Sequence, residues 1–177
     1  MANIPRKSID HLKTYDNIHM SSKLLTKDKI DFTKYFNAPS IRKPQGFWYS
    51  LGTDWLSWVR SEMPHWEYPF LYELLIDKSK LLIINNTNDL LNFINEYSIA
   101  NSSIKFDNRY EYKKINWYIL AKKYSGIEFS NYRKSYLLNK NKLNTLSLWY
   151  DGIDVSSGCI WNKNALISIN LIQEDCK

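Results

Sequence analysis

The chain is poor in the residues that make linkers, disulfides and metal sites. Its 177 residues include two cysteines, five glycines and five prolines. The cysteines, Cys159 and Cys176, match neither a disulfide framework nor a zinc site. So few glycines and prolines leave no flexible linker or low-complexity segment. We therefore expect one domain over residues 1–177, in which the polar residues 1–15 are loosely held.

Long apolar runs are also missing. No stretch approaches the roughly 18 consecutive apolar residues that a membrane span needs. The first residues, MANIPRKSIDHLK, are partly basic, but no apolar core follows them, so they do not read as a secretory signal. We expect a protein that does not enter membranes and that stays inside the cell.

The charge of the chain is positive but scattered. The formal net charge is +6 and the isoelectric point is near 9.1. The densest basic groups are short: Lys113–Lys114, Lys122–Lys123 and Lys140–Lys142. Abundant Lys, Asn and Ile are typical of an AT-rich genome, which is one reading of the charge. A phosphate-bearing partner is the other reading, because a positive excess attracts polyanions.

The hydrophobic pattern predicts strands and short helices without regular βαβ alternation. The expected strands cover 17–21, 47–51, 69–76, 80–84, 126–129, 145–150 and 158–161. Helical patterns occupy 27–37, the segment from Asp54 behind Thr53, and the segments behind Asn86 or Thr87 and behind Asn116. Residues 98–112 are expected to form a surface loop. This mixture favours the α+β class over a doubly wound sheet.

Aromatic residues make up 15% of the chain, with seven Trp and 13 Tyr. They either pack the core or line a pocket for a flat ligand. In Phe47–Trp48–Tyr49, successive strand residues point to opposite faces. If Trp48 belongs to the core, Tyr49 faces a second environment where it could stack on a ligand.

Three polar positions are candidates for chemistry. His19 and Ser21 lie two apart on an expected strand and therefore share a face; a surface or internally bonded histidine is the alternative. Glu128 lies in Gly126–Phe129, where it points either to water or into a cleft. Asp154 belongs to residues 149–162, which mix aromatic, acidic and small residues as a pocket wall or a turn would. No His, Cys or carboxylate spacing resembles a metal site.

Taken together, these segments resemble the ADP-ribosyltransferase-like fold in its His-Tyr-Glu variant. His19–Met20–Ser21 resembles the first motif, and Gly46–Phe47–Trp48–Tyr49–Ser50 with a helix behind it resembles the second. Residues 72–84 and the following helix resemble the layout between the second and third motifs. Glu128 follows Tyr49 by 79 residues and stands for the third. The composition also resembles that of proteins from large DNA viruses of protists, which would place the protein in the host cytoplasm.

The resemblance implies a single-domain split sheet with short helices and an NAD-dependent transfer of ADP-ribose to a protein or nucleic-acid acceptor. It implies three catalytic residues, His19, Tyr49 and Glu128, with Ser21, Ser50 and Asp154 added to the NAD-binding set. Nicotinamide would stack on Tyr49 near the backbone of Ser21. His19 would bond the adenosine-side ribose, and Glu128 the nicotinamide ribose.

The third motif departs from the family pattern. Gly126 stands two residues before Glu128, where an acidic or amide side chain is usual, so Asp154 is the alternative acid. Two other functions stay open. One is a non-catalytic module that binds nucleic acid or a host protein through aromatic and Lys side chains. The other is a structural or host-interaction protein whose aromatics only pack the core.

Overall fold

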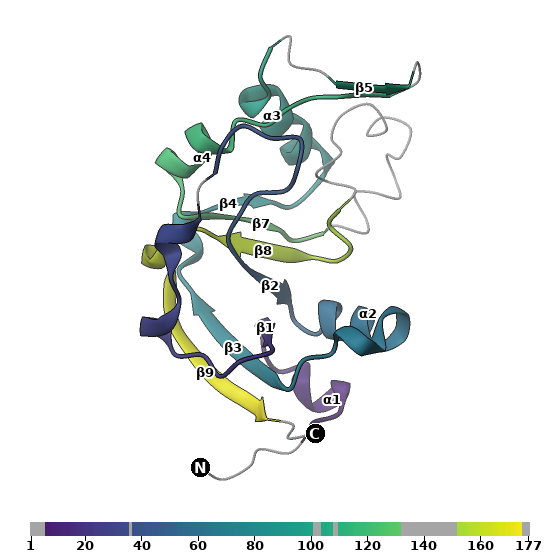
Figure 1. Ribbon diagram of the computed structural model, residues 1–177, viewed down its shortest axis with the longest axis vertical. Helices are drawn as coiled ribbons and strands as arrows, with labels where there is room; N and C mark the ends of the chain where they lie inside the picture. The colour runs from purple at the N-terminus through teal and green to yellow at the C-terminus, as the bar shows by residue number, and fades with distance from the viewer. Residues whose placement is uncertain (1–5, 36, 101–103, 108–109, 132–151, 175–177) are drawn as a thin grey trace.

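The structure of the protein, a computed structural model, describes residues 6–35, 37–100, 104–107, 110–131 and 152–174. A curved seven-stranded mixed sheet forms its centre, with strand order β4-β7-β8-β2-β1-β3-β9 (Figure 1). A second sheet pairs only β5 and β6. The α+β class expected from the sequence is confirmed, as one large sheet with a few short helices.

The main strands are β1 (Asn17–Ser21), β2 (Phe47–Leu51), β3 (Phe70–Ile76), β4 (Leu81–Ile84), β7 (Gly126–Phe129), β8 (Ser157–Ile160) and β9 (Leu166–Glu174). The small sheet contains β5 (Ile104–Asp107) and β6 (Tyr110–Tyr112). The α-helices are α1 (Ile9–Leu12), α2 (Asp54–Glu62), α3 (Thr87–Tyr97) and α4 (Trp117–Lys123). Single 3₁₀ turns are η1 (Lys27–Lys29), η2 (Phe32–Lys34), η3 (Pro64–Trp66), η4 (Lys78–Lys80) and η5 (Lys163–Ala165).

The sheet is weakly joined between β1 and β2. These strands pair only through Asn17 with Leu51 and Ile18 with Ser50. In contrast, β1 pairs with β3 from Ile18 to Ser21, and β2 pairs with β8 from Phe47 to Ser50. Beyond Ile18, therefore, β1 follows β3 while β2 follows β8, and the sheet opens between the two central strands.

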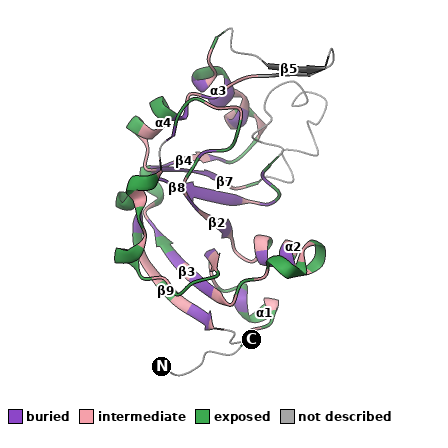
Figure 2. Ribbon diagram, in the orientation of Figure 1, coloured by how far each residue is buried: buried purple, intermediate pink, exposed green. Residues whose placement is uncertain are grey.

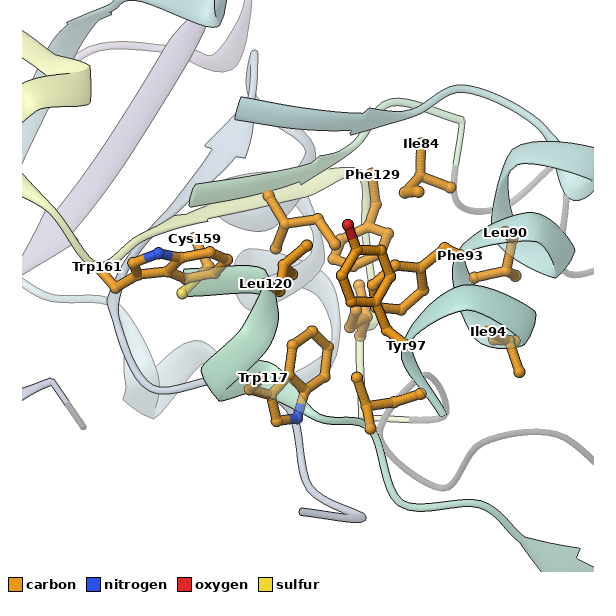
Figure 3. Close-up of a cluster of buried hydrophobic side chains, with 13 residues drawn as sticks. Ile84, Leu90, Phe93, Ile94, Tyr97, Trp117, Leu120, Phe129, Cys159 and Trp161 are labelled. Atoms are coloured by element: carbon orange, nitrogen blue, oxygen red, sulfur yellow. The ribbon is translucent and has the colours of Figure 1, made fainter. Parts of the chain in front are cut away.

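Two hydrophobic clusters lie on one face of the sheet, on either side of this opening. The larger cluster packs α3 and α4 against β7 and β8, with Trp117, Phe129 and Cys159 among its buried members (Figure 3). The smaller cluster joins α1 and α2 to β1 and β3 through Leu12, Leu56 and neighbouring residues. Figure 2 shows the strands at the centre of the sheet as mostly buried and the outer sides of the helices as exposed.

A third cluster covers the opposite face of the sheet. It includes Phe47, Tyr49 and Tyr72, and the segment around η1 and η2 packs over it through Leu25, Ile30 and Phe32. β2 contributes Phe47 and Tyr49 to this cluster and Trp48 to the other face. Both faces of the strand are therefore in contact with other parts of the chain.

The expected bounds of β1, β2 and β7 are confirmed, and Asn86 and Asn116 cap α3 and α4 as expected. Thr53 holds the N-cap position of α2, but its hydroxyl makes no capping hydrogen bond. The single helix expected over 27–37 is instead two 3₁₀ turns, η1 and η2. The expected strand 145–150 lies outside the described residues.

Four elements were not expected. The loop prediction for 98–112 was wrong where β5 and β6 form. β9 pairs along β3 with two register shifts, so its side chains do not keep the strict alternation that reveals a strand in sequence. The short helix α1 lies within the polar N-terminal segment and buries Leu12. None of the described helices has the length and apolar character needed to cross a membrane.

Candidate functional site

His19 lies at the opening between β1 and β2. Its Nδ1 is 2.7 Å from the backbone carbonyl oxygen of Trp48, and its ring lies 4.0 Å from the Phe47 ring, centre to centre. A carbonyl oxygen only accepts hydrogen bonds, so Nδ1 carries the proton and donates it. This tautomer leaves Nε2 of His19 as a hydrogen-bond acceptor.

The surroundings of His19 keep it neutral. Burial among uncharged groups lowers its pKa from 6.5 to about 4, and the hydrogen bond to Trp48 offsets only part of this effect. The imidazole is therefore uncharged at neutral pH, and Nε2 is free to accept a hydrogen bond from a hydroxyl group.

A pocket of about 290 Å³ opens at the same place. Its walls come from β1, β2, the first turn of α2 and the segment before β8. Ser50 and Ser157 are paired in register on β2 and β8, and Ser50 pairs with Ile18 of β1, so these three side chains share one sheet face. The lining consists of Ile18, His19, Met20, Lys43, Trp48, Tyr49, Ser50, Trp55, Gly152, Ile153, Asp154, Val155 and Ser157.

Asp154 supplies the carboxylate of this pocket. Ile153 and Val155 on either side of it are buried, while Asp154 itself is exposed. The alternation anchors the segment through its apolar side chains and leaves the acid at the surface of the cavity. Lys43 also lies at the pocket, where its Nζ donates to the Gly152 carbonyl at 3.2 Å and stands 5.1 Å from the centre of the Trp48 ring.

Tyr49 and Glu128 meet on the other face of the sheet. The Tyr49 hydroxyl donates to Glu128 Oε2 at 2.7 Å, and the two residues are only 3% and 6% exposed. The contact crosses β8 at Gly158, which pairs with both residues in register. A β-carbon at Gly158 would lie 2.1 Å from Tyr49 Cζ, so only glycine lets the phenol reach across.

Lys78 reaches this buried contact from the surface of the protein. Its Nζ forms an ion pair with Glu128 Oε2 and donates to Asn17 Oδ1 at 2.9 Å. The same Nζ lies 5.2 Å from the centre of the Tyr49 ring. Burial, and then the negative charge of Glu128, raise the pKa of the Tyr49 phenol well above its usual range. The polar groups of these side chains thus bond to one another. The set is hereafter called the buried ion-pair cluster and consists of Lys78, Glu128, Tyr49 and Asn17.

The structure brings some of the expected site residues together and separates others. His19, Tyr49, Ser50 and Asp154 all line the pocket. The Ser50 hydroxyl, however, is held by the Ile18 and Gly52 carbonyls at 3.3 and 2.9 Å.

Two expected residues lie elsewhere. Ser21 is not part of the lining, and its hydroxyl forms a local turn with Lys23. Glu128 is absent from the pocket wall and belongs to the buried ion-pair cluster.

Trp48, Lys43 and Lys78 are among the residues of these two regions that the sequence did not single out as site residues. For Trp48 the available signal was its position on the strand, opposite to Tyr49. Lys43 and Lys78 carried no signal, because their partners are 109 and 50 residues away along the chain. The described residues include no cluster of three or more His, Cys, Asp or Glu side chains able to hold a metal ion.

Comparison of the chain with protein-family models, with curated proteins and with solved structures finds no match. The pocket and the surfaces around it therefore provide the basis for assigning a function.

Proposed function

We propose that the protein is an NAD-dependent ADP-ribosyltransferase that binds the nicotinamide-ribose end of NAD in the pocket between β1 and β2. The observation that carries the proposal is the meeting of His19, Ser50 and Asp154 around one cavity, although Asp154 lies more than 100 residues from the other two along the chain. The opening of the sheet between β1 and β2 supports the accompanying proposal of an ADP-ribosyltransferase-like split sheet.

The size and lining of the pocket suit one end of a dinucleotide. Its volume of about 290 Å³ lies at the low end of the roughly 300–1,000 Å³ usual for small-molecule sites. Trp48 and Trp55 supply flat apolar surfaces for a pyridine ring. In this proposal nicotinamide stacks on Trp48, because the phenol of Tyr49 is occupied by Glu128.

Three side chains of the pocket, those of His19, Asp154 and Lys43, have a role in this proposal. His19 Nε2 accepts a hydrogen bond from a ribose hydroxyl. The Asp154 carboxylate stabilises the positive charge that develops at ribose C1′ when its bond to the nicotinamide nitrogen breaks. The bonding electron pair leaves with nicotinamide, and the acceptor then attacks C1′ and loses a proton. Lys43 stands beside the pocket, where a diphosphate would find a positive charge.

Asp154 suits the acid role better than Glu128. Glu128 is buried, and Lys78 already neutralises its charge, so it has no free negative charge to offer. Asp154 is exposed at the pocket, and no ion pair within the described residues involves it.

Binding and turnover are tested separately. Titration with NAD should quench tryptophan fluorescence, because Trp48 and Trp55 line the pocket, and Trp48→Leu should reduce both the quench and the affinity. Asp154→Asn should keep NAD affinity within about threefold but lower nicotinamide release by about 10²–10³-fold, the range typical for loss of one transition-state electrostatic contact.

The matched controls are Asp28→Asn, an exposed acid at a different surface, and Glu128→Gln. Both should retain nicotinamide release in their folded fraction. The acid role would pass to Glu128 if Asp154→Asn released nicotinamide at the wild-type rate while folded Glu128→Gln did not. Failure of the wild-type protein to bind or cleave NAD would reject the proposed enzyme.

A further inference from the structure

Two short segments of the chain carry positive charge without any acid. Residues 34–43 and 113–123 contain seven Lys or Arg residues and no Asp or Glu. The whole chain carries +6, so subtracting the +7 of these 21 residues leaves −1 for all the others. These two segments therefore form a local excess of positive charge, which the scattered sequence pattern did not reveal.

The fold holds these two segments side by side. Ser40 and Ile115 exchange backbone hydrogen bonds of 3.0 and 2.9 Å, and the Trp117 indole donates to the Arg42 carbonyl at 2.9 Å. The segment before β2 accordingly runs beside α4 (Figure 1). Buried apolar residues, Ile115 and Trp117, anchor this junction and leave the basic side chains outside.

The basic side chains at this junction are available for a partner. Arg42, Lys43 and Lys122 are exposed, and Lys113 and Lys114 are half-buried. None of these five residues, hereafter the basic strip, pairs with an acid within the described part of the chain. Lys123 is left out of the strip because Glu96 neutralises it at 2.9 Å.

Aromatic rings are interleaved with the strip. Tyr118 is 47% exposed, and Lys122 Nζ lies 4.3 Å from the centre of its ring. At the other end Lys43 covers Trp48 and lines the pocket. Proteins that bind single-stranded nucleic acids place cations along the phosphates and aromatic rings against the bases. A duplex keeps its bases stacked inside, where such rings cannot reach them.

A second exposed aromatic surface fits a nucleic acid less well. Trp55, Trp58 and Trp66 form a cluster on α2 and η3, with ring centres 4.9–6.4 Å apart. The charged groups beside them are either acidic, as Asp54 and Glu62, or paired, as Arg60 with Glu67. Within the part of the chain that the structure describes, this surface offers no free cation for phosphates, so the basic strip is the stronger candidate.

We propose that the basic strip binds single-stranded nucleic acid and leads it to the pocket. Its five cations follow the phosphates, Tyr118 stacks on a base, and Lys43 joins the strip to the pocket. The further idea that the bound strand accepts ADP-ribose rests on the proposed function. The binding of the strand does not depend on it.

The test measures binding without NAD, by fluorescence anisotropy of a fluorescein-labelled 20-nucleotide thymidylate strand. The variant Arg42→Glu/Lys113→Glu/Lys114→Glu should raise Kd by at least tenfold at about 100 mM salt. In a plot of log Kd against log salt concentration, the slope for this variant should be smaller by about 2 than the slope for wild type. Three lost phosphate contacts predict this difference for a single strand. Lys122→Glu is the milder variant if the triple variant does not fold.

The matched control reverses three exposed lysines on other surfaces, as Lys23→Glu/Lys29→Glu/Lys163→Glu. It has the same net charge as the strip variant and should change Kd by less than about threefold. Equal weakening in the two triple variants would overturn the proposal, because net charge alone would then govern binding. Displacement of the strand by polyglutamate of equal charge as efficiently as by unlabelled strand would also overturn it.

Tyr118→Ala separates stacking from charge. It should weaken single-strand binding about tenfold and leave binding to a 20-base-pair duplex unchanged. An equal loss on both probes would contradict the single-strand assignment. Strand binding without any NAD cleavage would reject the proposed enzyme and leave the basic strip as the site of a binding module.

Discussion

The two faces of β2 differ although their residues are neighbours in sequence. On the face that carries Ser50 and Trp48, the exposed Asp154 lines a cavity of about 290 Å³. His19 reaches the same cavity at the opening between β1 and β2, with its neutral ring against Phe47 of the other face. On the other face the phenol of Tyr49 is buried against Glu128 and Lys78. The carboxylate at the cavity, Asp154, is open to a ligand, whereas the carboxylate on the other face, Glu128, is paired with Lys78 inside the fold.

The difference between the two faces of β2 shows that the role of a carboxylate is indicated by its surroundings, rather than by its residue type or its spacing in the sequence. Glu128 is surrounded by partners that satisfy its charge, which is the arrangement of a structural group. Asp154 sits between two buried apolar residues, is exposed, and lines the cavity. Perturbing the two faces one at a time should therefore give opposite outcomes: loss of stability on the Tyr49 face, and loss of binding or turnover on the Trp48 face.

The largest stability effect is expected for Lys78→Met. The substitution leaves the buried Glu128 carboxylate without its cation and should lower the free energy of unfolding by about 2–3 kcal/mol, less than for a fully buried pair because Lys78 is partly exposed. Urea denaturation measures the change. Lys80→Met, an exposed lysine in the same turn, is the control and should change stability by less than about 0.5 kcal/mol. Equal effects would mean that the ion pair contributes nothing.

Gly158→Ala should destabilise the protein by about 2 kcal/mol, because the new methyl group would overlap the Tyr49 ring. The prediction is checked by thermal and urea denaturation. The double variant Gly158→Ala/Tyr49→Leu should recover part of the loss, since the smaller side chain removes the overlap. A double variant that is less stable than the sum of its parts would show that the phenol does not cross β8 at this point.

Protonation of His19 should weaken folding in acid. The unfolded state binds the proton with a pKa near 6.5 and the folded state with one of about 4, so stability falls as the pH is lowered through this window. The loss from His19 should reach about 2 kcal/mol by pH 5. Urea titrations at pH 7 and pH 5 should show a smaller loss in His19→Gln than in wild type. His11→Gln, which removes an exposed histidine, should behave like wild type.

The smallest effect is expected for Tyr49→Phe. It removes one hydrogen bond to Glu128 while Lys78 still pairs with the carboxylate, so the free energy of unfolding should fall by about 1 kcal/mol. NAD affinity should be unchanged if nicotinamide stacks on Trp48. A large loss of NAD affinity with unchanged stability would return the stacking role to Tyr49.

Much of the fold was predictable because its strands follow local rules. β1, β2 and β7 were expected with their observed bounds, and two helices begin at the asparagines that the sequence indicated. Strict alternation and side-chain caps are local features, so a single sequence contains them. β9 was not predicted, because its register shifts against β3 exist only once the two strands pair.

The candidate site was predictable only in part. His19, Tyr49 and Asp154 were expected to gather around a ligand; all three line the pocket, but the Tyr49 phenol is bound to Glu128 on the other face of the sheet. The partners of Glu128 could not be foreseen, because Lys78 reaches it only after η4 and β7 meet in the folded sheet. The basic strip was equally hidden, since its two segments lie about 70 residues apart and meet through Ser40 and Ile115.

The amino-acid sequence by itself determined the α+β class, the positions of several strands and helix starts, and the residue types available for chemistry, because these depend on neighbours within a few positions. Only the tertiary structure decided which side of β2 became a cavity, which acid was neutralised, and where the positive charge gathered. Those outcomes depend on contacts between residues far apart in the chain, and such contacts are fixed when the sheet closes around its core.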